Sequence, residues 1–217
     1  MSKQFDLIVW DWDGTLADST GMITQAIVSA AAQVGLPTLN PQAASNIIGL
    51  GLKESIQALF GDIPAEKAQA LAQQYTANYY AGEAEIPLFA GAKETIIELN
   101  RRGFKLAVAT GKGRRGLNLA LEHSGLTPYF HATKSVDECF SKPHPQMLDE
   151  LMDELVVRPE RTLMIGDTSY DLQMAQNANV QAIAVTFGAQ SRDKLLGYDS
   201  IALFNEFKDL SVWLLSL

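Results

Sequence analysis

The fold of the chain is decided near its beginning, by residues 5–15, which read Phe5-Asp6-Leu7-Ile8-Val9-Trp10-Asp11-Trp12-Asp13-Gly14-Thr15. The first six residues are mostly apolar, and such a short apolar run is typical of a strand buried in a sheet. The run ends abruptly at two aspartates, Asp11 and Asp13, and Gly14 permits a tight turn after them. We therefore expect a buried strand with two carboxylates at its carboxyl end.

The C-terminal part of the chain repeats this kind of strand in alternation with helical patterns. Further strands are predicted at residues 104–110, 162–166, 181–185 and 200–204, and helices at about 92–102 and 114–124, from about 145, within 167–178, and at the C-terminus. Strands that alternate with helices form a parallel sheet covered on both faces. The expected fold class is therefore α/β, a doubly wound parallel sheet.

Between the first strand and this alternating region lies a block with helical patterns only. Helices are predicted at about residues 20–34, 41–49, 52–60 and 65–80, and Ser19 is the expected N-cap of the first. An all-helical block after the first strand predicts an inserted second domain. We expect an α/β core domain formed by residues 1–16 and 86–217 and a helical cap domain formed by residues 17–85.

The composition is that of an ordinary globular protein. Of the 217 residues, 47% are hydrophobic and 19% are charged, which is enough to bury a core. No stretch reaches the roughly 20 apolar residues of a transmembrane helix, and the N-terminus lacks the pattern of a signal peptide. The single cysteine, Cys139, excludes an internal disulfide. These features predict a cytoplasmic protein that does not bind membranes.

The net charge of the chain indicates which partners it can bind. Seventeen basic and 25 acidic residues give a net charge of −8, so the surface repels a phosphate backbone and nucleic-acid binding is not expected. Six basic residues fall in one segment, where most are expected to be solvated: Arg101, Arg102, Lys105, Lys112, Arg114 and Arg115. An acidic protein can still bind a small phosphate ester where its site concentrates positive charge.

The chemically important residues follow the predicted strands. Asp11 and Asp13 come after the first strand, Thr110 ends the second, and Asp167 comes after Gly166. Ligands of open parallel sheets bind beyond the carboxyl ends of the strands, so these residues should line one crevice. Two adjacent carboxylates suit a nucleophile and a proton donor, although Asp-x-Asp-Gly is also a common polar turn.

Carboxylates in this crevice predict a metal ion. Asp11, Asp13 and Asp167 would repel a phosphate dianion unless a cation lay between them, and carboxylate oxygens are the ligands that Mg²⁺ prefers. The role of Asp171 stays open, because Thr168-x-x-Asp171 also has the spacing of a helix capping box.

Three further residues are candidates for binding phosphate. The Thr110 hydroxyl and the Gly111 amide stand before a predicted helix, where an anion is readily bound. Lys142 precedes Pro143, which would hold its ammonium over the crevice. Each of these residues, taken alone, is equally well a strand end or a surface residue.

In their order along the chain, these motifs resemble the four-motif signature of the haloacid dehalogenase superfamily. The order is strand-Asp-x-Asp-Gly-Thr, strand-Thr-Gly, Lys-Pro and strand-Gly-Asp-x-x-x-Asp, and residues 11–19 and 166–171 are its most specific parts. The resemblance covers essentially the whole chain. The helical block is similar to the small α-helical cap of that superfamily, and the chain looks most like the phosphoglycolate phosphatase-like branch.

The resemblance implies a Mg²⁺-dependent phosphatase that hydrolyses a small phosphate monoester. Asp11 would attack phosphorus and become a phosphoaspartate, and Asp13 would protonate the leaving group and then activate water. The Asp11 carboxylate, the Asp13 backbone carbonyl and the Asp167 carboxylate would hold Mg²⁺, with Asp171 supporting them through water or hydrogen bonds.

The remaining roles are implied in the same way. Thr110, the Gly111 amide and Lys142 would bind the phosphoryl oxygens. Residues 49–53, Gly-Leu-Gly-Leu-Lys, lie where related enzymes carry a specificity loop. Gly49 and Lys53 are therefore substrate-specificity candidates, Lys53 for a second anionic group, although the glycines could equally form a helix cap and a turn.

Several alternatives stay open. A sugar-phosphate mutase similar to β-phosphoglucomutase shares all four motifs, and nucleotides and pyrophosphate compete with phosphoglycolate, the default substrate of the branch. Dehalogenases and phosphonate hydrolases are disfavoured because they lack an aspartate at the position of Asp13. Outside enzymes, the chain could be a phospho-accepting switch or a silent binding protein, but a receiver domain is about half this length and carries its acceptor on a middle strand. Oligomeric state cannot be predicted from the sequence.

Overall fold

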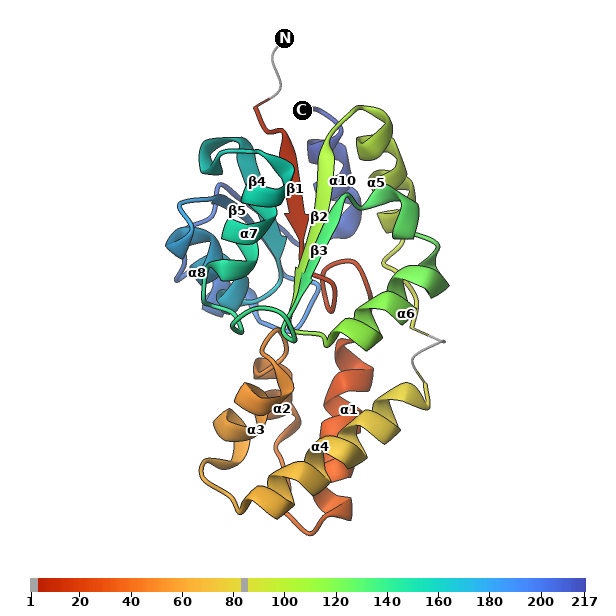
Figure 1. The fold of residues 1–217 in the computed structure, drawn as a ribbon, viewed down its shortest axis with the longest axis vertical. Coiled ribbons are helices and arrows are strands. Elements are labelled where there is room, and N and C mark those ends of the chain that lie inside the picture. The colour runs from red at the N-terminus through yellow and green to blue at the C-terminus, as the bar shows by residue number, and fades with distance from the viewer. Residues whose placement is uncertain (1–3, 83–85) are drawn as a thin grey trace.

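The computed structural model describes residues 4–82 and 86–217 and contains a six-stranded parallel sheet (Figure 1). The strand order is β3-β2-β1-β4-β5-β6. The strands are β1 (Leu7–Trp10), β2 (Lys105–Thr110), β3 (Ala132–Ser135), β4 (Thr162–Gly166), β5 (Gln181–Val185) and β6 (Ala202–Phe204). All five strand pairs are parallel, and the predicted fold class is confirmed.

Helices cover both faces of the sheet. One apolar core includes residues of α5 (Ala92–Arg101), α6 (Arg114–Ser124) and α10 (Phe207–Leu214). The other includes residues of α7 (Gln146–Leu155), α8 (Ser169–Asn177) and α9 (Arg192–Leu195). Among the described residues, no helix is both long enough and apolar enough to cross a membrane.

The centre of the sheet is β1, and its sequence explains why. All four of its side chains are fully buried. Ile8 and Trp10 belong to one apolar core, whereas Leu7 and Val9 belong to the other. A strand covered on both faces needs a continuous apolar run rather than an alternating one. Each buried aliphatic side chain of this kind contributes roughly 1.5–3 kcal/mol to folding.

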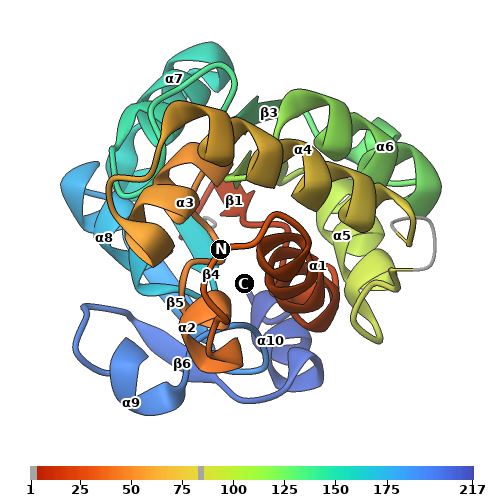
Figure 2. The same cartoon turned by 90° about the horizontal axis from the view of Figure 1, so that it is seen from below.

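The helical block forms below the carboxyl ends of the strands (Figures 1 and 2). It contains α1 (Thr20–Gln33), α2 (Pro41–Asn46), α3 (Leu52–Phe60) and α4 (Ala65–Tyr80). Its own apolar cluster includes Ile27 from α1, Ile56 from α3 and Leu71 from α4. A separate cluster supports the proposed domain division at residues 17–85, which stays a proposal. Its second boundary touches residues 83–85, and the core domain starts with residues 1–3, all outside the described residues.

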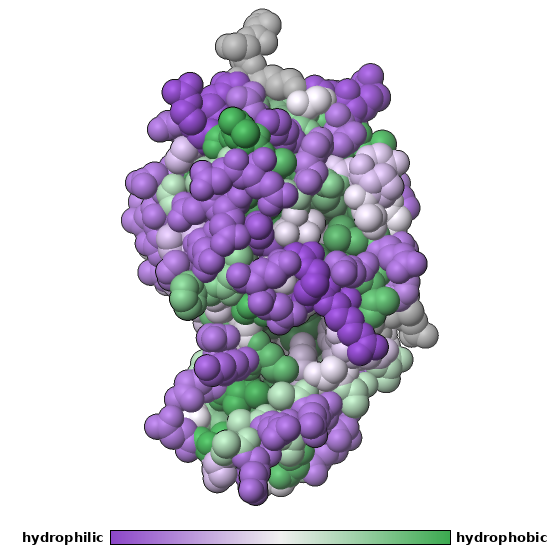
Figure 3. Space-filling view, in the orientation of Figure 1, coloured by the Kyte–Doolittle hydropathy of each residue, from purple (hydrophilic) through white to green (hydrophobic). Residues whose placement is uncertain are grey.

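Two chain crossings join the helical block to the core. The Asp18 N–H donates to the Pro87 carbonyl at 2.9 Å, and the Phe89 N–H donates to the Leu16 carbonyl at 2.9 Å. The segments on either side of the block therefore lie side by side. The surface is hollowed between core and block (Figure 3).

Most predicted elements agree with the structure, and the differences have local causes. The helices at 52–60, 65–80 and 114–124 and the strands at 162–166 and 181–185 are confirmed. The helix predicted at 41–49 ends at Asn46, before Gly49 with its positive φ of 98°. The edge strand β3 was not predicted, because Ala132-Thr133-Lys134-Ser135 is short and has no apolar run. The four-residue helix α9 was not predicted either.

One backbone position is strained and offers a test of the fold. Val156 follows α7 in the left-handed region, with φ 52° and ψ 56°, and its side chain is 86% exposed. A β-branched residue is unfavourable there, whereas glycine is not. We expect Val156→Gly to raise the free energy of unfolding, measured in urea, by about 0.5–1 kcal/mol. This gain is the backbone strain that glycine relieves, reduced by the extra conformational entropy that glycine gives the unfolded chain. Val212→Gly, at an exposed position inside α10, should lower it. Equal destabilisation by both changes would contradict the assignment of strain.

Candidate active site

The predicted site residues converge at the carboxyl edge of the sheet. Since β2, β1 and β4 are neighbours, Thr110, Asp11 and Asp167 stand side by side at the ends of these strands. The Asp11 N–H extends the ladder by donating to the Ile165 carbonyl at 2.9 Å. All of these side chains, and that of Asp13, are buried. The edge faces the helical block (Figure 1).

A buried lysine joins two of the aspartates. The Lys142 Nζ lies 2.7 Å from Asp11 Oδ1 and 2.6 Å from Asp171 Oδ1, and the lysine side chain is fully buried. Lys142 is thus not a surface residue, and its ammonium lies between two carboxylates. Burial by itself lowers the pKa of Lys142, but the Asp11 and Asp171 charges outweigh it and raise the pKa above its usual range. The two carboxylates therefore favour the charged form of the ammonium.

The capping-box prediction for Asp171 is confirmed, and the same carboxylate also contacts the buried lysine. Its Oδ2 accepts hydrogen bonds from the Thr168 N–H at 3.1 Å and the Thr168 hydroxyl at 2.6 Å, within the capping box that starts α8. Its Oδ1 accepts from Lys142. The residue therefore fixes the start of a helix and also positions the buried lysine.

Three carboxylates form a group that could hold a metal ion. Asp11, Asp167 and Asp171 each offer an oxygen within 4.8 Å of the others. Asp167 is oriented by the Thr15 hydroxyl at 2.9 Å and the Ala189 N–H at 2.7 Å. Apart from its ion pair with Lys142, neither buried oxygen of Asp11 accepts a hydrogen bond from a described residue. The Asp11 Oδ2, which has no ion pair or hydrogen bond with a described residue, lies beside two further carboxylates, and such a group fits a divalent cation.

The pKa values carry the signature of carboxylates crowded together. Burial raises the pKa of Asp11 to about 7, although Lys142 lowers it and Asp171 raises it further. Burial, followed by the charges of Asp11 and Asp171, raises the pKa of Asp167 well above its usual value. Without a cation, these groups resist ionising together.

The carboxylate of Asp13 points elsewhere and has different partners. Its Oδ1 accepts a hydrogen bond from the Ser19 hydroxyl at 2.8 Å and lies 3.2 Å from Lys112 Nζ. Ser19 is the N-cap residue of α1, as predicted, but its hydroxyl makes no capping hydrogen bond and donates to Asp13 instead. The carboxylate of Asp13 is not part of the metal-capable group.

Lys112 is the site residue that sequence reasoning missed. It was grouped with solvated basic residues, but its side chain is only 7% exposed. Its Nζ also donates to the Tyr79 hydroxyl of α4 at 2.6 Å, so the side chain reaches from core to cap. The sequence signal for this role is its position, two residues after Thr110 at the carboxyl end of β2.

Thr110 and Gly111 lie where the phosphate cradle was predicted. Thr110 is buried, and its hydroxyl oxygen accepts the Lys112 N–H at 3.2 Å. A Cβ on Gly111 would lie 2.5 Å from the Gly49 carbonyl oxygen and 2.6 Å from that of Leu50. Only glycine therefore lets residues 49 and 50 approach this closely.

The comparison with known proteins now decides the family. The family model described as haloacid dehalogenase-like hydrolase matches residues 8–185, which contain every site residue described above. The chain belongs to the haloacid dehalogenase-like hydrolases. This assignment makes it an enzyme, and the four motifs identified in the sequence are those of its family.

Individual relatives of this hydrolase carry different names. A Dickeya dadantii protein named probable phosphatase IndB is 32% identical over 94% of this chain and 91% of its own length. A phosphoglycolate phosphatase of Aliivibrio fischeri is 28% identical, covering 97% and 96%. A pyrophosphatase PpaX of Bacillus mycoides is 25% identical, covering 95% of both chains. A crystal structure titled as a predicted phosphatase from Clostridium acetobutylicum matches with a TM-score of 0.87 and 26% identity, over 99% of this chain and all of that one.

The helical block of this hydrolase is hydrogen-bonded to the core. The Gly51 N–H donates to the Ser141 hydroxyl at 2.9 Å, and the Ser45 hydroxyl donates to the Ala189 carbonyl at 2.9 Å. The Tyr170 hydroxyl donates to the Asn46 carbonyl at 3.3 Å. A Cβ on Gly49 would lie 3.0 Å from the Thr168 hydroxyl oxygen. The predicted specificity loop therefore contacts the core at the site.

A cavity of about 420 Å³ remains between cap and core. Asp11, Asp13, Thr110 and Gly111 line it on the core side. Lys53 also lines it, but from an exposed position in the first turn of α3. Lys142, Asp167 and Asp171 are not among the lining residues and lie behind the surface of the cavity.

The raised pKa values predict how stability depends on pH in the metal-free protein. Asp11 binds its proton more tightly when folded, with a pKa of about 7 against an ordinary 3.8. Its stabilising contribution is therefore complete below the ordinary pKa and is lost as the pH rises through about 7. We expect the Tm of the wild type, relative to that of Asp11→Asn, to fall between pH 5 and pH 8. Mg²⁺ should restore the wild-type Tm most at the upper end.

The control for this measurement is Asp18→Asn, which changes an exposed aspartate of the same loop. It should follow the wild type at every pH. A difference in Tm between wild type and Asp11→Asn that stays constant from pH 5 to pH 8 would contradict a raised pKa at Asp11.

Proposed function

We propose that this hydrolase is a Mg²⁺-dependent phosphatase that hydrolyses a small phosphate monoester through a phosphoaspartate on Asp11. The observation that carries the proposal is the Asp11 carboxylate. It is buried at the edge of a cavity, next to the Lys142 ammonium, and its oxygens accept no other hydrogen bond from the described residues. The phosphatase names of several relatives support the same activity.

Mg²⁺ is proposed to bind at Asp11 and Asp167, together with the backbone carbonyl of Asp13. Bound there, it would supply the positive charge that lets a phosphate dianion approach these carboxylates. Asp171 is already bonded to Thr168 and Lys142. It therefore supports the site from outside by holding the lysine.

The reaction uses Asp11 and Asp13 in two balanced steps. A carboxylate oxygen of Asp11 forms a bond to phosphorus while the bond to the leaving oxygen breaks, and Asp13 gives that oxygen its proton. Asp13 then takes a proton from water, whose oxygen attacks phosphorus and releases phosphate from Asp11. Thr110, the Gly111 amide and Lys142 bind the phosphoryl oxygens throughout, so catalysis consists mainly of positioning and charge neutralisation.

The helical block is proposed to close over bound substrate as a cap. The paired crossings near residues 17–18 and 86–89 provide the hinges, and the contacts of Ser45 and Gly51 with the core support a closed state. Closure excludes water from the phosphorylated aspartate. The partner is therefore a small phosphorylated metabolite rather than a phosphoprotein.

The relatives are named for different substrates, so their names do not identify the leaving group. Phosphoglycolate is the substrate expected from the resemblance, and one relative is named for it, whereas another is named for pyrophosphate. A sugar-phosphate mutase is the remaining rival within the same chemistry. Strong activation by a sugar bisphosphate would identify a mutase, and a phosphatase should show none.

The metal proposal predicts the response to chelation. We expect EDTA to abolish phosphate release and Mg²⁺ to restore it. Ca²⁺ should substitute poorly, because its larger and looser coordination shell would misplace the Asp11 carboxylate. Phosphate release is measured with a panel of small esters after each addition. Full activity in a metal-free preparation would rule out the metal.

The roles of the two aspartates predict the effect of removing each. Asp11→Asn should abolish turnover and phosphoenzyme formation, because an amide cannot attack phosphorus. Asp13→Asn should lower kcat by about 10²- to 10⁴-fold through loss of proton transfer. Exposed Asp18→Asn is the matched control and should retain activity. Turnover near the wild-type rate in Asp11→Asn would show that the nucleophile lies elsewhere.

A further inference from the structure

The cap side of the cavity is apolar and aromatic. Ile23 and Ile27 line it from α1, Ile48 and Leu50 from the loop after α2, and Tyr75 and Tyr80 from α4. Apolar cap residues are visible beside the hollow in Figure 3. A volume of about 420 Å³ lies within the range that holds a ligand larger than phosphate with a two-carbon group.

The charged residues that line the cavity are unfavourable for a second anionic group. Four are acidic, Asp11, Asp13, Glu54 and Asp137, and two are basic, Lys53 and Lys112. With all four carboxylates ionised and no metal ion counted, negative charge exceeds positive charge among these lining residues. The two lysines decide whether a second anion could still be held.

Neither lysine is placed to bind a second anion deep in the cavity. The Lys112 ammonium already lies 3.2 Å from Asp13 Oδ1 and bonds to the Tyr79 hydroxyl at 2.6 Å. Lys53 is exposed, and its neighbour Glu54 lines the same cavity. An anion near Lys53 would therefore meet a carboxylate as well as the ammonium.

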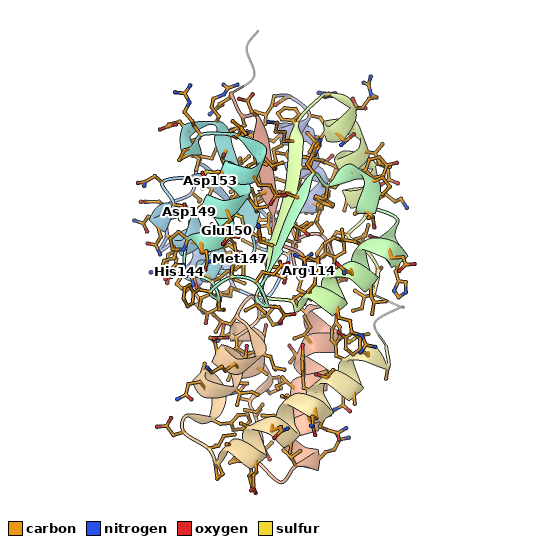
Figure 4. The ribbon with its side chains drawn as sticks, in the orientation of Figure 1. Arg114, His144, Met147, Asp149, Glu150 and Asp153 are labelled. Atoms are coloured by element: carbon orange, nitrogen blue, oxygen red, sulfur yellow. The ribbon has the colours of Figure 1, made fainter. Side chains whose placement is uncertain are left out.

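Arg114 does not change this balance. It stands at the start of α6, close to the carboxyl end of β3 (Figure 4). Its guanidinium bonds to Thr133 and Glu138. Only its backbone N–H reaches Asp137, at 2.6 Å. The guanidinium is thus directed to the edge of the sheet, and it forms no ion pair with the Asp137 carboxylate beside the cavity.

We propose that the leaving group of the substrate is a neutral alcohol whose apolar or aromatic part fills the cap side of the cavity. Burying a carboxylate against isoleucine and tyrosine side chains without a partner is costly, whereas burying a phenyl or alkyl group there is favourable. The inference rests on the proposed phosphatase function. It differs from the phosphoglycolate expectation, since that substrate carries a second anion.

Three phosphate esters of primary alcohols test the proposal with matched leaving oxygens. They are 2-phenylethyl phosphate, ethyl phosphate and phosphoglycolate, each assayed for kcat/KM with Mg²⁺. We expect the 2-phenylethyl ester to exceed the ethyl ester by about tenfold or more, from burial of the ring. Phosphoglycolate should fall below ethyl phosphate. Phosphoglycolate at or above ethyl phosphate would overturn the proposal, as would equal values for the two neutral esters.

A positive charge added to the cavity lining tests whether the lack of an available cation disfavours an anionic leaving group. Thr76 lines the cavity from the exposed side of α4, where its hydroxyl only bonds to the Ala72 carbonyl of its own helix. Thr76→Lys should raise the ratio of kcat/KM for phosphoglycolate to that for ethyl phosphate several-fold. Thr76→Met, of similar length and uncharged, should leave this ratio unchanged. A ratio that the added lysine does not alter would contradict the charge argument.

Lys112 provides the remaining control. Its ammonium could move away from Asp13 and bind an anionic leaving group itself. If it stays with Asp13, Lys112→Met should lower kcat/KM for all three esters by a similar factor. A loss confined to phosphoglycolate would overturn the proposal. Failure of the phosphatase function itself would look different, since no ester would then be hydrolysed faster than by Asp11→Asn.

Discussion

The site depends on one buried ammonium, that of Lys142, which lies between the carboxylates of Asp11 and Asp171. A fully buried charge is tolerated only when it is paired, and removing one partner leaves the other uncompensated. The three residues come from the end of β1, the loop before α7 and the first turn of α8. The lysine therefore holds together separate segments of the core and concentrates positive charge inside an acidic protein.

The topology of the sheet makes this arrangement possible. Because β1 is central and fully buried, its end places Asp11 between the ends of β2 and β4. Burial raises the pKa values of Asp11 and Asp167, and the negative charges of the neighbouring carboxylates raise them further. The proposed Mg²⁺ would offset the negative charge of these carboxylates and so let a phosphate dianion approach them.

The sequence was sufficient to predict the parts of the site that follow buried strands. Asp11, Thr110 and Asp167 stand directly after apolar runs, and parallel strands bring their carboxyl ends together. Lys112 and Ser19 could not be assigned in this way, because their roles depend on tertiary contacts with Asp13 and Tyr79. The strand β3 was missed for a related reason. An edge strand is covered less, so its residues need not be apolar.

The proposed closure of the helical block and the proposed selection of the substrate depend on the same contacts. Gly111 lets the carbonyls of Gly49 and Leu50 approach the phosphate end of the cavity, while Lys112 connects Asp13 to Tyr79 on the cap. Lys112 therefore links α4 to the Asp13 carboxylate, which is proposed to transfer the proton. The positive charge of Lys112 is already balanced by that carboxylate. The proposed neutral leaving group would then be held by shape and apolar contact rather than by charge. In this proposal, specificity follows from the way in which the helical block is attached to the core.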